Sequence, residues 1–438
     1  MAKISLIGAG SRGFAKGFLM DIMTRPALAG GTLALMDNNR ERLEVMTTLA
    51  QKMARQLDVP TTIESTLELR PALDGADYVI SIIRPPGVDS KEEPLEIAKK
   101  YGVDQAVGCT TGPNGVFTAL KYMPPLLEII KTMEEVCPQA LFLHYSNPTT
   151  SLPWILNLIS PVRSIGMCHS VQGTAMQLAR YIGAPYEETG HWVAGINHQA
   201  WFLRFEWNGE DAYPLVREKM SDPETHEQDI VRFEMMRYFG HFLTESSTHN
   251  SEYVPYFRRS PEMVERFRNR RGPGATVGEH VGSVARWKKS VAEKDKRLRE
   301  EAFGDGTIEI EQSDEYSVGI INAMETNEPY RFNGNVLNTG LVTNLPEGCC
   351  VEVPCLVDNM GVHPCFVGDL PPQCASLNRN RLAGDELTVK GALERDRKAI
   401  EQAIALDPLT AAVCTLDQVH AMTEEIFTEL THQIGTYT

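Results

Sequence analysis

A glycine-rich motif close to the N-terminus constrains the fold of this chain more than any other feature. Residues 3–7 form an apolar run that predicts a β-strand, and the motif Gly8-Ala9-Gly10-Ser11-Arg12-Gly13 follows it directly, where a helix is expected to begin. Glycines at this spacing let backbone N–H groups approach a pyrophosphate at the N-terminus of the helix. The motif in this context therefore predicts a dinucleotide-binding α/β sheet.

A carboxylate at the end of the second predicted strand supports the same interpretation. Residues 32–36 form another apolar run, and Asp37 follows it. A carboxylate in this position accepts hydrogen bonds from an adenosine ribose and repels a 2′-phosphate, which favours NAD over NADP. The alternative is a glycine turn that binds no phosphate, with Asp37 as a helix cap. We assign five residues to cofactor binding: Gly8, Gly10, Ser11, Arg12 and Asp37.

Predicted strands and helices alternate up to about residue 199, as in a doubly wound sheet. Arg84 and Asn147 each follow a strand, and ligands of open α/β sheets bind at the carboxyl ends of strands. We assign Arg84 to cofactor and substrate binding. We assign Asn147 to binding of sugar hydroxyls, although it could serve only as a turn residue.

Further strands are expected at 61–65, 76–83, 141–145 and 165–167, and helices at 39–57, 91–101 and from a loop at 110–115 to residue 136.

Past residue 200 the alternation ends. The predicted fold class is α/β, with an N-terminal Rossmann-type doubly wound, mostly parallel sheet and a second mixed α/β domain over its carboxyl edge. We place an NAD-binding domain at residues 1–199 and a substrate-binding and oligomerisation domain at residues 200–438. The second domain is expected to contain strands at 201–207, 330–337 and 350–357, helices at 224–242, 279–301, 390–405 and 415–430, and a polar, aromatic site-lining loop at 244–257.

Two more strand ends carry side chains that bind metal ions. Cys168 follows the apolar run 165–167, and His198 follows the run 192–196. If these ends meet, a thiolate and an imidazole can share one divalent metal ion and leave coordination positions open for a substrate. The alternative is that Cys168 is a small core side chain and His198 a buried histidine with satisfied hydrogen bonds.

The charge balance narrows the choice of partners. The chain has 42 Lys+Arg against 58 Asp+Glu, a formal net charge of −16 and no long basic run, which argues against nucleic acid and anionic membrane surfaces. No apolar stretch approaches about 18 residues, so no membrane-spanning helix is expected. The N-terminus opens directly into a strand, and the nine cysteines form no CxxC pairs. We therefore expect a reduced, cytoplasmic protein without a signal peptide.

Motifs along the whole chain resemble those of the family-4 glycoside hydrolases, which are NAD- and metal-dependent glycosidases. Within this family the residues after the metal-binding cysteine track the substrate class, and His-Ser-Val resembles the form found in α-galactosidases. Related α-galacturonidases and α-glucosidases remain alternatives. Besides the glycine motif, the resemblance rests on Asn147-Pro148, Cys168-His169-Ser170-Val171, Gly195-Ile196-Asn197-His198, Ser251-Glu252-Tyr253, Asn333-Gly334-Asn335-Val336, Asn344-Leu345-Pro346 and Val351-Glu352-Val353-Pro354.

The resemblance implies NAD and Mn²⁺ as cofactors and a small-molecule glycoside as substrate. It implies oxidation of the sugar at carbon 3 by NAD⁺, removal of the proton on carbon 2 by a base, departure of the glycosidic oxygen, addition of water and return of the hydride. It also implies a homodimer or homotetramer. An NAD-dependent sugar or 2-hydroxyacid dehydrogenase and a non-catalytic NAD-sensing regulator are the other candidate functions.

The resemblance also assigns roles to individual residues. Cys168 and His198 match the metal ligands, and Tyr253 matches the base, with Tyr256 as the second choice. We place His169 and Asn197 in the catalytic group. His169 could protonate the leaving oxygen or bind a sugar hydroxyl.

Three departures from the family pattern bear on the substrate. Relatives that act on 6-phosphoglycosides carry Asp or Asn where this chain has His169, and the loop after Gly87 has no evident basic cluster for a sugar phosphate. We therefore expect a non-phosphorylated glycoside. Asn114 and Thr149 stand where relatives often have Gly and Met, so the preferred sugar can differ from that of melibiose-type substrates.

Overall fold

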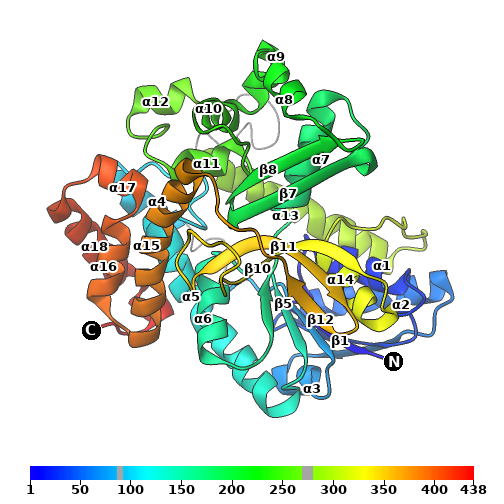
Figure 1. Ribbon diagram of the computed structural model, residues 1–438. Coiled ribbons are helices and arrows are strands. Elements are labelled where there is room, and N and C mark those ends of the chain that lie inside the picture. The colour runs from blue at the N-terminus through cyan, green and yellow to red at the C-terminus, as the bar shows by residue number, and fades with distance from the viewer. Residues whose placement is uncertain (86–91, 269–279) are drawn as a thin grey trace.

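One continuous mixed sheet organises the molecule (Figure 1). The structure, a computed structural model, describes residues 1–85, 92–268 and 280–438, and within these residues twelve strands form the sheet. Their order is β3-β2-β1-β4-β5-β6-β10-β11-β7-β8-β9, and β12 lies beside β11. The loop after Gly87 and the expected first helical residue Glu279 lie outside the described residues.

Six of these strands form the parallel half of the sheet, and their order β3-β2-β1-β4-β5-β6 is that of a Rossmann fold. β1, β4 and β5 are almost wholly buried, as expected for central parallel strands covered by helices on both faces. The predicted fold class is thereby confirmed. The strands are β1 (Lys3–Ile7), β2 (Thr32–Met36), β3 (Thr62–Thr66), β4 (Tyr78–Ser81), β5 (Leu141–His144) and β6 (Ser164–Gly166).

An antiparallel half continues from β6. β10 pairs with β6 where Asn335 lies opposite Gly166, and β11 pairs with β7 where Glu352 lies opposite Gly195. Because Asn335 and Glu352 are also paired with each other, one row of four residues crosses four strands. The strands of this half are β7 (Thr189–Ile196), β8 (Gln199–Trp207), β9 (Glu210–Asp211), β10 (Tyr330–Leu337), β11 (Cys350–Asp358) and β12 (Gly361–Pro364).

Helices from both ends of the chain pack together around the sheet. The C-terminal helices α15, α16 and α18 pack against one another or against α4 and α5 of the N-terminal half, and they lie on the left in Figure 1. The expected domain boundary at residue 199 falls at the start of β8, which pairs with β7 in the same sheet, and the division into domains at that residue stays a prediction. The helices of the N-terminal half are α1 (Ala15–Met23), α2 (Arg40–Leu57), α3 (Leu69–Leu73), α4 (Glu92–Lys100), α5 (Gly112–Val136), α6 (Ser151–Ile159), α7 (Ser170–Ile182) and the 3-10 helix η2 (Tyr186–Glu188). Those that follow are α8 (Tyr213–Met220), α9 (Pro223–Gln228), α10 (Ile230–Phe239), α11 (Ser247–Tyr253), α12 (Pro261–Arg266), α13 (His280–Phe303), α14 (Tyr316–Thr326), α15 (Pro372–Glu394), α16 (Arg397–Ala405), α17 (Pro408–Val413) and α18 (Leu416–Ile434).

The segment 244–257 corrects one expectation, because the sequence predicts a loop and the structure contains helix α11. The hydroxyl of Ser246 accepts a hydrogen bond from the backbone N–H of His249 and caps this helix. Polar residues of the helix are buried, including Asn250 and Glu252. The side chain of Asn250 donates to the carbonyls of Thr244 and Ser246. An apolar 3.6-residue period is absent from the sequence because hydrogen bonds replace apolar packing on this helix.

Two other helix boundaries were also predicted wrongly. The expected loop 110–115 is helical from Gly112, with Pro113 in the first turn, where a proline is well tolerated. The expected helix 390–405 is the end of α15 followed by α16. Arg395 takes a left-handed φ of 58° between them, and Asp396 caps α16 through the N–H of Ala399. Buried polar residues such as Asp385 interrupt the apolar period of α15 and hide its length.

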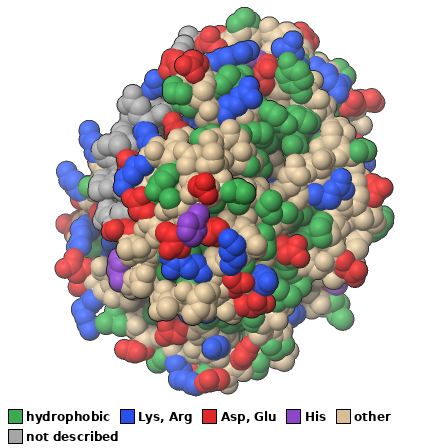
Figure 2. All heavy atoms as spheres, turned by 90° about the vertical axis from the view of Figure 1, so that its left-hand side faces the viewer, with side chains coloured by type: hydrophobic (Ala, Val, Ile, Leu, Met, Phe, Trp, Pro, Cys, Tyr) green, Lys and Arg blue, Asp and Glu red, His purple; other side chains and the backbone are tan. Residues whose placement is uncertain are grey.

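The face formed by the C-terminal helices carries Asp, Glu, Lys and Arg side chains side by side (Figure 2). Arg397 of α16 pairs with Glu424 of α18 at 2.6 Å, and Lys398 pairs with Glu401 at 2.5 Å. Pairs this exposed contribute little to stability because water screens them.

In the part of the chain that the structure describes, no helix combines the length and the apolar character needed to cross a bilayer. The structure contains a single chain, so the expected homodimer or homotetramer stays a prediction.

Gly8 offers a test of how closely the glycine motif contacts the sheet. Its φ is +87°, and a Cβ added to it would lie 2.9 Å from backbone atoms of Ile82 and Ile83. Gly75 has a similar φ of +66° but nothing within 4 Å of such a Cβ. We expect Gly75→Ala to lower the free energy of unfolding by about 1–2 kcal/mol through backbone strain alone. Gly8→Ala should cost roughly 1–3 kcal/mol more because of the overlap.

Urea denaturation of both variants beside the wild-type chain measures this difference. Equal losses of stability in the two variants would show that the loop moves away from β4 without cost.

Candidate functional site

The glycine motif and Asp37 are joined by hydrogen bonds at the carboxyl ends of β1 and β2. The backbone N–H of Gly10 donates to Asp37 Oδ2 at 2.8 Å, and the N–H of Asn39 donates to Oδ1 at 2.8 Å. A Cβ on Gly10 would lie 2.8 Å from the same carboxylate oxygen and 2.6 Å from Cβ of Arg42. Glycine is therefore required here by the close approach of Asp37 and α2, and the carboxylate keeps lone pairs for a further donor such as a ribose hydroxyl.

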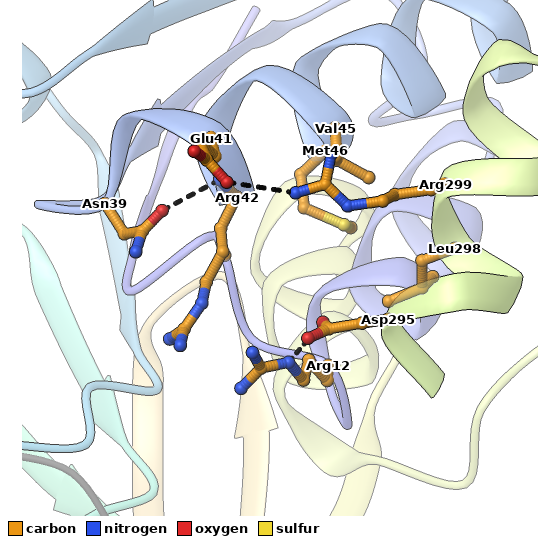
Figure 3. A pocket seen from close by; sticks show the side chains of 10 residues that line it. Arg12, Asn39, Glu41, Arg42, Val45, Met46, Asp295, Leu298 and Arg299 are labelled. Carbon is orange, nitrogen blue, oxygen red and sulfur yellow. Dashed lines mark hydrogen bonds and ion pairs between the residues drawn. The ribbon is translucent and has the colours of Figure 1, made fainter. Parts of the chain in front are cut away.

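A cavity of about 180 Å³ opens beside this motif, between α2 and α13 (Figure 3). Arg12 forms an ion pair with Asp295 of α13, and Arg299 of α13 lies 3.2 Å from Glu41 of α2. Two of the three arginines on its walls pair with these carboxylates, so the lining has one more positive than negative side chain, which favours an anionic ligand. Its lining residues are Gly10, Arg12, Asn39, Glu41, Arg42, Val45, Met46, Asp295, Leu298 and Arg299.

The other predicted cofactor and substrate residues lie at or near strand ends. The hydroxyl of Ser11 accepts a long hydrogen bond of 3.4 Å from the N–H of Phe14, at the start of α1. Arg84 is exposed just after β4. Asn147 follows β5, precedes a cis peptide bond to Pro148, and accepts a hydrogen bond of 2.8 Å from the hydroxyl of Thr149.

Cys168 and His198, 30 residues apart in sequence, are brought into contact. Cys168 Sγ lies 3.3 Å from His198 Nε2, and both side chains are buried. Cys168 lies between β6 and α7, and His198 occupies the two-residue turn between β7 and β8 with a left-handed φ of 63°. This contact favours a shared metal site over the alternative, in which Cys168 and His198 are two unrelated core residues.

Both side chains suit a divalent metal ion. Burial lowers the pKa of His198, which keeps its imidazole neutral and able to bind a metal, and its Nδ1 has no hydrogen-bond partner among the described residues. Burial raises the pKa of the Cys168 thiol, so a nearby cation is needed to hold the thiolate. With bond lengths of about 2.0–2.3 Å, a 3.3 Å separation corresponds to an angle of roughly 100° at a shared ion.

His169, next to the cysteine, is positioned to donate a proton. Its Nδ1 lies 3.3 Å from Glu315 Oε1, and this contact raises the pKa of the imidazole above its usual value. The side chain of His169 is 58% exposed, so water screens the pair in part. His169 is therefore protonated near neutral pH and remains accessible to solvent.

The same residue lies next to the start of α1. The rings of His169 and Phe14 have their centroids 6.2 Å apart, and Tyr145 lies 5.3 Å from Phe14. Phe14 comes directly after the glycine motif, so this ring contact links the motif to the residue that follows Cys168.

Tyr253 and Asn197 complete the predicted set. The ring centroid of Tyr253, on α11, lies 6.5 Å from that of His198. Burial raises the pKa of this phenol well above its usual value, while the charge of Arg381 opposes the rise. Asn197 is buried beside His198 in the β7–β8 turn, and its Nδ2 has no hydrogen-bond partner among the described residues. Tyr256, the second choice as base, is 44% exposed.

Three acidic or basic residues near the site were given no role of their own from the sequence, although two lie in the expected site-lining segment 244–257 and the third lies in one of the family motifs. Glu245 Oε1 lies 3.1 Å from His249 Nδ1. Burial lowers the pKa of His249, but the carboxylate of Glu245 and other neighbours outweigh burial and raise it to about 9. Glu352 is fully buried in β11, and burial raises its pKa to about 7 against the influence of His198, Asn197 and Asn335.

A signal for each of these residues exists in the sequence. Glu245 and His249 are four residues apart, which would place them on one helix face if the helix included both, although α11 begins only at Ser247. Glu352 interrupts an apolar strand. The spacing was missed because the segment 244–257 has no apolar helical period.

Comparison with known proteins finds family models that match both halves of the chain and relatives that match nearly its whole length. The family model described as "Family 4 glycosyl hydrolase" matches residues 3–184, and that described as "Family 4 glycosyl hydrolase C-terminal domain" matches residues 193–410. An α-galactosidase of Bacillus subtilis is 38% identical over 98% of this chain and 98% of its own length. An α-galactosidase of Rhizobium meliloti is 33% identical over 97% of this chain and 87% of its own length.

A solved structure has the same fold. It is a 6-phospho-α-glucosidase from gut microorganisms, crystallised in complex with NAD and Mn²⁺, and it is 18% identical to this chain. The TM-score is 0.82, and the match covers 100% of both chains.

The contact between His169 and Glu315 predicts a measurable pKa. Because the carboxylate holds the pKa of the imidazole above its usual value, Glu315→Gln should lower the pKa of His169 toward about 6.5. Titration of the histidine ring protons by NMR measures this shift.

Glu234→Gln is a matched control, because Glu234 contacts a different histidine, His226, at 3.7 Å. A His169 titration that is the same in Glu315→Gln and in the wild-type chain would show that Glu315 does not control the proton.

Proposed function

This chain belongs to family 4 of the glycosyl hydrolases, and from that premise we propose that it hydrolyses α-galactosides with the help of bound NAD⁺ and Mn²⁺. The observation that carries the proposal is the contact between Cys168 and His198 at 3.3 Å, with His169-Ser170-Val171 after the cysteine. Two enzymes named α-galactosidase are 38% and 33% identical to this chain over nearly its whole length, which supports the choice of sugar.

The residues of the two candidate sites fit the cofactors of this proposal. Gly8, Gly10, Ser11, Arg12 and Asp37, with Arg84, would hold the dinucleotide, and Cys168 and His198 would hold the metal ion. When bound, NAD⁺ supplies a reversible hydride acceptor for carbon 3 of the sugar, and the divalent cation supplies a Lewis acid. The remaining chemistry belongs to protein side chains.

Tyr253 would remove the proton from carbon 2. Oxidation of carbon 3 to a ketone acidifies this proton, so a phenolate is a sufficient base. Burial disfavours the phenolate, whereas the nearby guanidinium of Arg381, 6.0 Å from the ring centroid, favours it. Ionisation of Tyr253 to the phenolate therefore depends on positive charge near its hydroxyl group.

His169 would protonate the glycosidic oxygen as it leaves. Its contact with Glu315 favours the protonated form, and its exposure lets it regain a proton from solvent. Water then adds to carbon 1, carbon 2 regains a proton, and reduction of carbon 3 restores the sugar. Asn197 and Asn147 have amide groups that could bind and orient sugar hydroxyls.

For the preferred sugar there are two alternatives to an α-galactoside, namely an α-galacturonide and an α-glucoside. Asn114 and Thr149, which depart from the family pattern, are both buried. Asn114 Nδ2 donates to the carbonyl of Gly108 at 2.5 Å, and the hydroxyl of Thr149 donates to Asn147 at 2.8 Å. Thr149 thereby orients the amide that we assign to the substrate.

A substrate panel tests the choice of sugar. The purified chain with NAD⁺, Mn²⁺ and a thiol should hydrolyse para-nitrophenyl α-galactoside with a kcat/KM at least about tenfold above the α-glucoside and α-galacturonide. Release of nitrophenol measures the rates. A higher kcat/KM for either competitor would replace galactose in the proposal, and no hydrolysis of any would reject a glycosidase.

Hydrolysis in D₂O tests the chemistry. Because Tyr253 would exchange its proton with solvent, galactose formed in D₂O should carry deuterium at carbon 2, detected by NMR or mass spectrometry. Tyr253→Phe should lose both hydrolysis and exchange yet still bind NAD⁺. Product without deuterium would exclude proton removal at carbon 2, and lasting NADH in amounts equal to product would favour a dehydrogenase.

A further inference from the structure

Two more side chains lie beside the Cys168–His198 pair, and we propose that they complete a metal site with four protein ligands, Cys168, His198, Glu245 and His249. The inference deepens the proposed function and rests on it, because it concerns the same divalent cation. Cys168 and His198 alone would leave most of the coordination sphere to water and substrate.

The first support is the geometry of a cluster formed by His198, Glu245 and His249. One ligand atom from each of these residues lies within 4.8 Å of the other two. The rings of His198 and His249 meet edge to face with centroids 4.9 Å apart. Of three ligands around one ion at about 2.0–2.3 Å, only one pair can lie on opposite sides, roughly 4.0–4.6 Å apart, and ligands at right angles are roughly 2.8–3.3 Å apart. Glu245 and His249 already have the shorter separation, at 3.1 Å, and the rest of the cluster would contract around an ion. Cys168 is outside that mutually close set but contacts His198 at 3.3 Å.

The second support is the backbone of two cluster residues. Among the described residues, six that are not glycine have a positive φ. Asp58, Asn327 and Arg395 end helices, and Asn208 precedes the two-residue strand β9. The remaining two belong to the cluster. His198, at φ 63°, lies in the two-residue turn between β7 and β8, where a positive φ is common, whereas Glu245, at φ 76°, lies just before the N-cap of α11, where it is not. Strained backbone of this kind is concentrated at functional sites, because the surrounding structure must hold it in place.

The third support is the way in which Glu245 is held. Its backbone N–H donates to the hydroxyl of Thr174 at 3.1 Å, and its carbonyl accepts from the guanidinium of Arg232. Arg232 is itself buried and forms an ion pair with Asp229. The backbone of Glu245 is therefore fixed from both sides, and its carboxylate is directed at His249 before any ion binds.

Charge balance gives the physical reason for a carboxylate ligand. A divalent cation bound only by one thiolate and one imidazole leaves one positive charge in a buried site, which is costly. Glu245 supplies the second negative charge and makes the site neutral. Imidazole, carboxylate and thiolate groups all bind divalent transition ions. The four side chains would occupy four of six octahedral positions and leave two for neighbouring oxygens of a substrate.

Titration of Mn²⁺ into the metal-free full-length chain, followed by calorimetry, tests the inference. Glu245→Gln and His249→Gln should each raise the Kd for Mn²⁺ about tenfold or more. Glu234→Gln and His226→Gln are matched controls, since this second Glu–His pair lies outside the cluster, and they should leave the Kd unchanged. Glu245→Gly removes the carboxylate while glycine accepts the left-handed φ, so it separates loss of a ligand from misfolding.

Replacement of Mn²⁺ by Co²⁺ gives a second measurement. The thiolate-to-cobalt absorption of the wild-type chain should persist in Glu245→Gln, and the visible bands that report the coordination geometry should change. A Kd within twofold of the wild-type value in both Glu245→Gln and His249→Gln, with Cys168→Ser weakened, would overturn the four-ligand site. Weaker binding in Glu352→Gln but not in Glu245→Gln would also overturn it, by assigning the second negative charge to Glu352.

The outcome for the metal site is independent of that for the proposed function. If Glu245→Gln and His249→Gln bind Mn²⁺ weakly but no glycoside is hydrolysed by the wild-type chain, the metal site stands and the function fails. If the wild-type chain hydrolyses α-galactosides and these variants bind Mn²⁺ normally, the function stands and the four-ligand site fails.

Discussion

One row of paired residues across four strands determines where the metal-binding candidates meet. Gly166, Asn335, Glu352 and Gly195 lie opposite one another on β6, β10, β11 and β7. The amide of Asn335 donates to the carbonyl of Gly166 at 3.0 Å and ties the parallel half of the sheet to the antiparallel half. A flat row of four strands is about 14 Å wide, yet Cys168 Sγ and His198 Nε2 are 3.3 Å apart. The segments that follow β6 and β7, together with the two side chains, therefore span this width.

Glycine at both ends of the row makes the close approach of neighbouring segments possible. A Cβ on Gly166 would lie 2.5 Å from Pro153 and 2.7 Å from Thr149, and a Cβ on Gly195 would lie 2.8 Å from the backbone of the next strand. Between them, Glu352 is a buried carboxyl whose pKa burial raises to about 7. The row thus combines close packing with a polar group that an apolar core would not contain, which is typical of a functional site.

Burial and charge act in opposite directions around these residues. Burial favours a neutral thiol at Cys168 and a neutral phenol at Tyr253, although the proposed chemistry needs a thiolate and a phenolate. A divalent cation between the strand ends would reverse both preferences. The protein chain by itself is therefore incomplete for this chemistry, and the bound cofactors are needed both as reactants and as the source of positive charge.

Much of the fold follows from local sequence patterns. The apolar runs at 3–7 and 32–36 and the strand expected at 330–337 coincide with β1, β2 and β10, and the glycine motif lies where it was expected. Helix α11 and the length of α15 were not predicted, because their buried faces carry polar residues such as Asn250 and Asp385. Asn250 donates to the nearby carbonyls of Thr244 and Ser246, whereas Asp385 pairs with Arg381 one turn away and accepts a hydrogen bond from Ser151 of α6.

The candidate site divides in the same way. The sequence by itself determined the chemical types, a glycine motif with Asp37 and a cysteine and a histidine at strand ends, because each follows from residues that are adjacent in the chain. Only the tertiary structure decided that Cys168 touches His198 and that Glu245, His249 and Glu352 lie beside them. These contacts join residues from separate strands, turns and helices. Their distances depend on the course of the segments that follow β6 and β7 and on left-handed backbone at His198 and Glu245, neither of which a local pattern specifies.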